Sequence, residues 1–86
     1  MIDMNVLRDL TNAFGPSGFE DEVIREVKNW CGGLDVVNDA MYNVYATMKK
    51  KKAGRPVLML DAHLDEIGLM VTGIENGFLR FCSIGG

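Results

Sequence analysis

The hydrophobic and polar positions at the beginning of the chain repeat with the period of an α-helix. Apolar residues recur three, four and seven positions apart, which places them on one face of a helix. The two sets are Val6, Leu7, Leu10, Ala13, Phe14 and Val23, Ile24, Val27, Trp30, Cys31. Asp3 is suited to cap the first helix, and Ser17 with Glu20 has capping-box spacing for the second. Residues 15–18, Gly-Pro-Ser-Gly, separate the two helices because proline lacks an N–H donor and glycine permits a sharp reversal.

Beyond Gly33 the apolar period changes from 3.6 to 2, which is typical of β-strands. We expect five strands, at residues 34–37, 44–48, 57–60, 67–74 and 78–84. Asn76-Gly77 is a strong hairpin signal between the last two. The segment 57–60 is apolar on both faces, as in a central strand covered by helices. The lysines at 49–52 indicate a solvated loop.

This order of elements predicts an α/β fold with two helices followed by about five strands in a mixed sheet. Two helices cover one face of such a sheet at best. The sequence therefore predicts the beginning of a larger domain, and a sheet left with open edges is expected to associate with further strands.

Composition excludes several classes of function. The 86 residues carry nine basic and twelve acidic side chains, a net charge of −3. Nucleic-acid binding would need a basic stripe, which this chain lacks. No apolar run approaches the roughly 20 residues needed to span a bilayer, and the N-terminus has no basic region of a signal peptide. We therefore expect a cytoplasmic protein that binds neither nucleic acid nor membrane.

The candidate chemistry follows the apolar segment 57–60. His63, the only histidine, and Asp65 are separated by one residue, with Asp61 and Glu66 beside them. Neutral imidazole is a good ligand for zinc or cobalt, and a nearby carboxylate orients it. The alternative interpretation is a polar turn with local hydrogen bonds. One histidine does not make a catalytic zinc site, which commonly takes three protein ligands.

Residues 62–68, Ala-His-Leu-Asp-Glu-Ile-Gly, resemble the A-H-x-D-E-I-G signature of the M42 family of metallo-aminopeptidases. This is the family of glutamyl aminopeptidases and TET peptidases, sometimes labelled endoglucanases. Residues 15–20 are similar to its P-S-G-[FY]-E element, and residues 39–44 to its D-x-x-G-N-[LV] element, with Tyr42 in place of the usual glycine. Residues 78–86 are similar to the segment that leads into the family's inserted domain. The resemblance covers essentially the whole chain.

The resemblance implies that residues 1–86 are the N-terminal portion of a zinc-peptidase-like (phosphorylase/hydrolase-like) α/β catalytic domain. This portion would end at the start of the inserted dimerisation domain. By resemblance, His63 would ligate one metal of a site for two divalent ions, zinc or cobalt. Asp65 would be the supporting catalytic acid that holds His63. In the family, metal-activated water attacks the peptide carbonyl with the help of a glutamate base. That base and the other ligands lie downstream, so we expect an inactive segment of an aminopeptidase.

Two other functions stay open. The chain could be a non-catalytic assembly or binding module with an M42-like fold. Its partners would then be copies of itself or the remainder of such a domain, rather than the peptide substrate of the complete enzyme. An endoglucanase-type glycoside hydrolase is a weaker alternative, because Asp61, Asp65 and Glu66 are too clustered to be assigned as acid and base.

Overall fold

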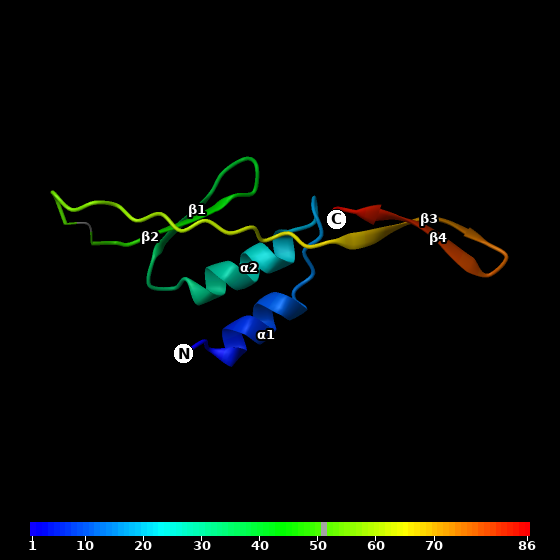
Figure 1. Ribbon diagram of the computed structural model, residues 1–86, viewed down its shortest axis with the longest axis horizontal. Coiled ribbons are helices and arrows are strands. Elements are labelled where there is room, and N and C mark those ends of the chain that lie inside the picture. Colours follow the sequence, from blue (N-terminus) through cyan, green and yellow to red (C-terminus); the bar gives the residue numbers. More distant parts are fainter. Residues whose placement is uncertain (51) are drawn as a thin grey trace.

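The computed structural model describes residues 1–50 and 52–86, and it shows two helices followed by two β-hairpins (Figure 1). The elements are α1 (Met4–Asn12), α2 (Asp21–Trp30), β1 (Asp35–Asn38), β2 (Val44–Thr47), β3 (Gly68–Glu75) and β4 (Phe78–Ile84). β1 pairs with β2 and β3 with β4, both antiparallel, as two separate sheets. Within the loop predicted at 49–52, Lys51 lies outside the described residues.

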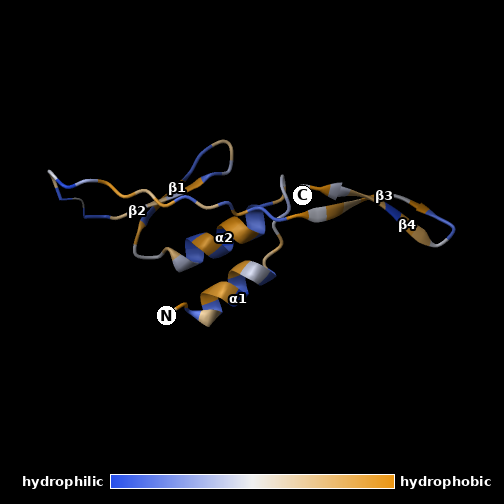
Figure 2. Cartoon of the chain, in the orientation of Figure 1, coloured by the Kyte–Doolittle hydropathy of each residue, from blue (hydrophilic) through white to orange (hydrophobic). Residues whose placement is uncertain are grey.

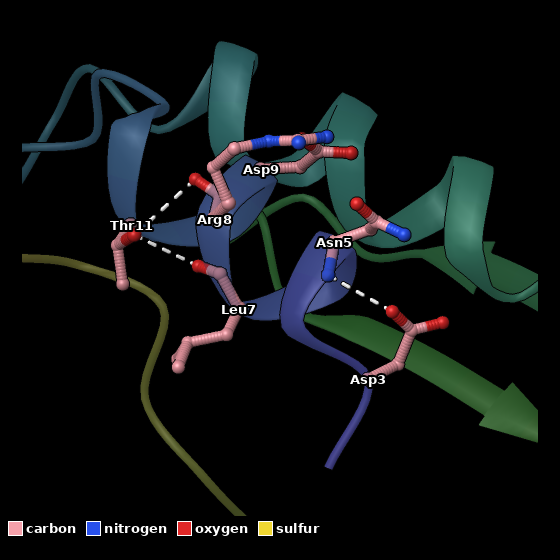
Figure 3. A network of polar contacts seen from close by, with 6 residues as sticks. All are labelled: Asp3, Asn5, Leu7, Arg8, Asp9 and Thr11. Atoms are coloured by element: carbon pink, nitrogen blue, oxygen red, sulfur yellow. Dashed lines mark hydrogen bonds and ion pairs between the residues drawn. The ribbon is translucent and has the colours of Figure 1, made fainter.

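The helix pair holds the core. Ala13, at the end of α1, and Val23 and Ile24, on α2, are the buried apolar side chains of the described residues. The predicted cap of α1 is confirmed, because the Asp3 carboxylate accepts the N–H of Asn5 at 2.9 Å (Figure 3). Within residues 1–50 and 52–86, no helix has the length and apolarity to cross a membrane. The three buried apolar side chains place the core of the described residues where the two helices meet.

The predicted capping box at the start of α2 is wrong. Glu20 itself occupies the N-cap position, and no side chain caps the helix. Phe19 N–H donates to the Pro16 carbonyl at 2.8 Å, so Ser17 lies inside a turn rather than at the helix start. The Glu20 carboxylate accepts the N–H of Gly18 at 2.7 Å instead. The proline-led turn therefore takes precedence over the S-x-x-E spacing.

The hairpin predicted at Asn76-Gly77 is confirmed. Both residues have positive φ, 51° and 79°, and they connect Glu75 directly to Phe78 in the β3–β4 register. Positive φ at both central residues is the requirement of the type I′ turn, whose twist matches that of paired strands. An ion pair between Arg80 and Glu75 joins the two strands beside this turn.

The strand predicted at 57–60 and the five-stranded mixed sheet are not present among the described residues. The segment runs as part of a long trace, hydrophobic in sequence, that belongs to neither of the two sheets (Figures 1 and 2). The side chains of residues 57–60 are 75–91% exposed. A strand requires a neighbour to pair with its main-chain groups, and the hairpins pair only within themselves. Parallel pairing is limited, in the part described, to one bridge between Pro16 and Glu66.

The molecule is elongated and open as a result. Its extents are 65 × 28 × 18 Å and its radius of gyration is 17.4 Å, against about 12 Å for a compact domain of this length. Its accessible surface is 7663 Å², whereas a compact monomer of this mass would expose about 5,000 Å². About a third of the surface is therefore in excess of what a closed domain of this size exposes.

Candidate functional site

His63 and Asp65 are brought together in the loop that precedes β3. The His63 Nδ1 atom lies 2.9 Å from the main-chain oxygen of Asp65 and 3.4 Å from its carboxylate Oδ1. A carbonyl oxygen only accepts, so in this contact Nδ1–H is the donor. The other ring nitrogen, Nε2, then carries the free lone pair. The His63 side chain is 87% exposed, and that of Asp65 is 49% exposed.

The other two acids of the loop are not part of this pair. The Glu66 carboxylate points towards the turn between α1 and α2, where its Oε1 accepts the N–H of Gly15 at 3.3 Å. Asp61 is exposed. The hydrogen bond to Asp39 is the main cause that raises the pKa of Tyr45, and the charge of Asp61 adds to it. Among the described residues, no group of three or more His, Cys, Asp or Glu side chains could hold a metal ion. The local arrangement therefore offers one imidazole with an orienting acid.

Main-chain contacts attach the loop to the interhelical turn. Glu66 N–H donates to the Gly15 carbonyl at 2.9 Å, and Pro16 forms the parallel bridge with Glu66. Gly15 and Pro16 are both buried. The sequence had indicated only a helix stop at Gly15. Its contact with Glu66 was missed because a main-chain partner 51 residues away leaves no pattern in the side chains.

A second polar cluster lies in the turn between β1 and β2. The Asp39 carboxylate accepts hydrogen bonds from the Asn43 side-chain amide at 2.8 Å, from the main-chain N–H groups of Asn43 and Met41, and from the Tyr45 hydroxyl. The Asn43 side chain, followed by those N–H groups, holds the pKa of Asp39 below its ordinary value. Hydrogen bonding to Asp39 in turn raises the pKa of Tyr45. Because Asp39 is engaged in its own turn, its role here is structural.

Within that turn Tyr42 has a φ of 65°, in the left-handed region that favours glycine. This is the position at which the D-x-x-G-N element has its glycine. Tyr42 therefore adopts a backbone conformation that a glycine at this position would adopt without strain. Residues 43–86 match the sequence model of the family described as M42 glutamyl aminopeptidase. The chain belongs to the M42 glutamyl aminopeptidase family.

Known aminopeptidases match nearly the whole chain. It is 40% identical to a putative aminopeptidase of Acetivibrio thermocellus over 95% of its length, and 33% identical to a lysyl aminopeptidase of Pyrococcus furiosus over 100%. It covers 25% of each of these two relatives. The crystal structure of a TET aminopeptidase from a marine sediment archaeon (Thaumarchaeota) has a TM-score of 0.78 and 37% identity. That match covers 96% of this chain and 23% of the archaeal one. The chain thus spans about a quarter of the length of these aminopeptidases.

Proposed function

We propose that this chain supplies His63 as one ligand of a divalent-metal site and Asp65 as the acid that orients it, in the catalytic domain of an M42 aminopeptidase. The observation that carries the proposal is the bond from His63 Nδ1 to Asp65, which leaves Nε2 free and exposed within residues 62–68. A metal-bound histidine almost always donates its other ring N–H to a carboxylate, a carbonyl or water. His63 has two of these partners in one residue, so the donor set fits one corner of a two-metal centre for zinc or cobalt.

Divalent ions at such a centre would supply an activated water for hydrolysis of peptides at their N-terminal residue. The contribution of this chain is to hold the proton on His63 Nδ1 and to keep Nε2 in one direction. The family's general base and remaining ligands have no counterpart among residues 1–86. We therefore expect the 86-residue chain to bind Co²⁺ weakly and to leave peptides uncleaved. Its place would be the N-terminal part of the catalytic domain, up to the family's inserted dimerisation domain.

A Co²⁺ titration followed by NMR tests this role, because the paramagnetic ion broadens signals near its binding site. We expect broadening centred on residues 62–66 that is lost in His63→Ala. In Asp65→Ala the affinity should fall about tenfold or more, the usual effect of removing an orienting partner. Glu75→Ala removes an exposed acid of the β3–β4 hairpin and is the matched control, with unchanged affinity expected. Broadening that persists in His63→Ala would refute the assignment of His63.

A second candidate function, a non-catalytic assembly module, is favoured by the exposed segment 57–60. In an M42 domain this segment would gain strand neighbours and become a central strand of a five-stranded mixed sheet. The chain would then act by joining such a domain or a second copy of itself. Self-association that survives His63→Ala, combined with no Co²⁺ binding by the wild-type chain, would favour assembly over metal binding.

A further inference from the structure

Gly15 and Glu66 are joined by two hydrogen bonds that link the beginning of the chain to the loop bearing His63. Glu66 N–H donates to the Gly15 carbonyl at 2.9 Å, and Gly15 N–H donates to Glu66 Oε1 at 3.3 Å. The second bond is partly buried, so water competes with it less than with a surface contact. We refer to this pair of bonds as the Gly15–Glu66 contact.

The contact reaches both neighbours of Asp65. A Cβ placed on Gly15 would lie 3.7 Å from the Leu64 carbonyl oxygen, so Leu64 passes directly beside Gly15. Glu66, on the other side of Asp65, is hydrogen-bonded to Gly15. In an extended stretch, successive side chains point to opposite faces. Accordingly Leu64 is half-buried beside the turn, whereas His63 and Asp65 are exposed and contact each other.

The other side of Gly15 is fixed by the helical core. A Cβ on Gly15 would lie 2.9 Å from Cγ1 of Val23, a buried residue of α2. Gly15 therefore has α2 on one side and the loop on the other. The main-chain oxygen of Asp65, which accepts the His63 Nδ1–H, belongs to the peptide unit that continues into Glu66. Holding Glu66 against Gly15 thereby fixes the acceptor that His63 uses.

We propose that Glu66 is a positioning residue, which sets the tautomer and orientation of the His63 ring by anchoring the Asp65–Glu66 peptide to Gly15. The carboxylate acts through Asp65 and does not itself hold a metal. The consequence for metal affinity rests on the proposed function of His63. The consequence for the His63 tautomer does not.

The experiment uses the 86-residue chain and four variants. Glu66→Ala removes the acceptor of Gly15 N–H, and Glu66→Gln keeps an oxygen at the same reach. Glu66→Asp keeps the charge but withdraws the oxygen, while Glu75→Ala is the control. In mildly alkaline, metal-free solution, ¹⁵N shifts of the His63 ring report the fraction of the Nδ1–H tautomer. Hydrogen exchange reports Gly15 N–H, and a Co²⁺ titration reports affinity.

We expect Glu66→Ala and Glu66→Asp to lower the Nδ1–H fraction and to speed Gly15 exchange by about two- to tenfold, the usual range for one hydrogen bond. Co²⁺ affinity should fall about two- to fivefold, less than for a group that contacts the imidazole itself. In Glu66→Gln the tautomer fraction, the Gly15 exchange rate and the Co²⁺ affinity should all equal those of the wild-type chain. Glu75→Ala should change none of the three. If Glu66→Ala loses its helical circular dichroism, Glu66→Asp decides on the same readouts.

Faster Gly15 exchange without a change in the His63 tautomer would overturn the proposal, because the contact would then be structural only. An unchanged tautomer and unchanged exchange would overturn it equally. A tautomer that responds to Glu66 while Co²⁺ binding is insensitive to His63→Ala would support the positioning role and refute the metal role. The two proposals therefore fail on different measurements.

Discussion

Gly68, the first residue of β3, lies against the ring of Pro16. A Cβ added to Gly68 would be 3.0 Å from Pro16 Cβ and 3.5 Å from Pro16 Cγ. The proline ring is rigid and Pro16 is buried, so the ring cannot easily move away from an added Cβ. This approach lets the start of β3 lie next to the interhelical turn, two residues beyond the Gly15–Glu66 contact. Glycine is needed at position 68 for close packing, since its φ is not in the left-handed region.

Gly68→Ala should separate the loop from the interhelical turn. Inserting a methyl group into such a contact typically costs about 1–3 kcal/mol. We expect faster hydrogen exchange at the amides of Gly15 and Glu66. Gly73→Ala is the matched control, because it lies on the same strand and a Cβ there meets nothing within 4 Å. Equal exchange rates in the two variants would contradict the packing role of Gly68.

Tyr42 carries backbone strain in the β1–β2 turn. Its φ of 65° is costly for a residue with a Cβ by roughly 1–2 kcal/mol. We compare Tyr42→Gly with Tyr42→Ala, because both lose the exposed phenol ring and only the second keeps the Cβ. The glycine variant should be more stable than the alanine variant by about 1 kcal/mol, or about fivefold in hydrogen-exchange protection of the β1–β2 ladder amides. Equal protection in the two would show that this backbone conformation is not strained.

The turn between β1 and β2 should depend on pH through Asp39. Hydrogen bonds from the Asn43 side chain, then from the main-chain N–H groups of Asn43 and Met41, lower the pKa of Asp39 from 3.8. A lowered folded-state pKa means that the stabilisation is complete above the unfolded value and is lost as the pH falls through the folded-state value. The amide shift of Asn43 should therefore stay constant at neutral pH and titrate in acid with a midpoint below 3.8.

Asp39→Asn provides the control for this titration, because its side chain does not ionise. The Asn43 amide shift should then be flat across the same acidic range. A carboxyl titration of Asp39 with its midpoint at 3.8 or above would contradict the predicted direction.

The features that could be predicted from the sequence are those decided within a few residues. The Asp3 cap depends on Asn5, two positions away, and the Asn76-Gly77 turn depends on two adjacent φ angles. The His63–Asp65 contact belongs to the same class, since the partners are separated by one residue. In each case the short separation fixes the geometry with few alternatives.

Two of the features that were missed or wrong depend on residues far apart in the sequence, and the Ser17 capping box is a local exception. The apolar run at 57–60 has the composition of a strand, but a strand needs a partner to pair with, and the described strands pair only within their own hairpins. The capping box at Ser17 failed because the turn from Pro16 to Phe19 places Ser17 before the helix. Gly15 and Glu66 meet through main-chain atoms, whose bonding has no signature in residue type. Apart from the Ser17 capping box, local contacts could be predicted from the sequence, and long-range contacts could not.

The exposed segment 57–60 should make the chain associate with itself. The accessible surface of the whole chain exceeds that of a compact monomer by about 2,600 Å². This excess is more than the roughly 1,200–2,000 Å² buried in a standard interface. An apolar, unpaired stretch is the usual route to intermolecular strand pairing. Sedimentation equilibrium should therefore give a mass above the monomer's 9.5 kDa that rises with concentration.

Leu58→Lys should lower that mass towards 9.5 kDa, because a lysine opposes edge pairing. Asn29→Lys, on exposed α2 surface, adds the same charge and should leave association unchanged. A mass of 9.5 kDa at every concentration of the wild-type chain would refute self-association, and an equal effect of both lysines would assign it to net charge rather than to this segment.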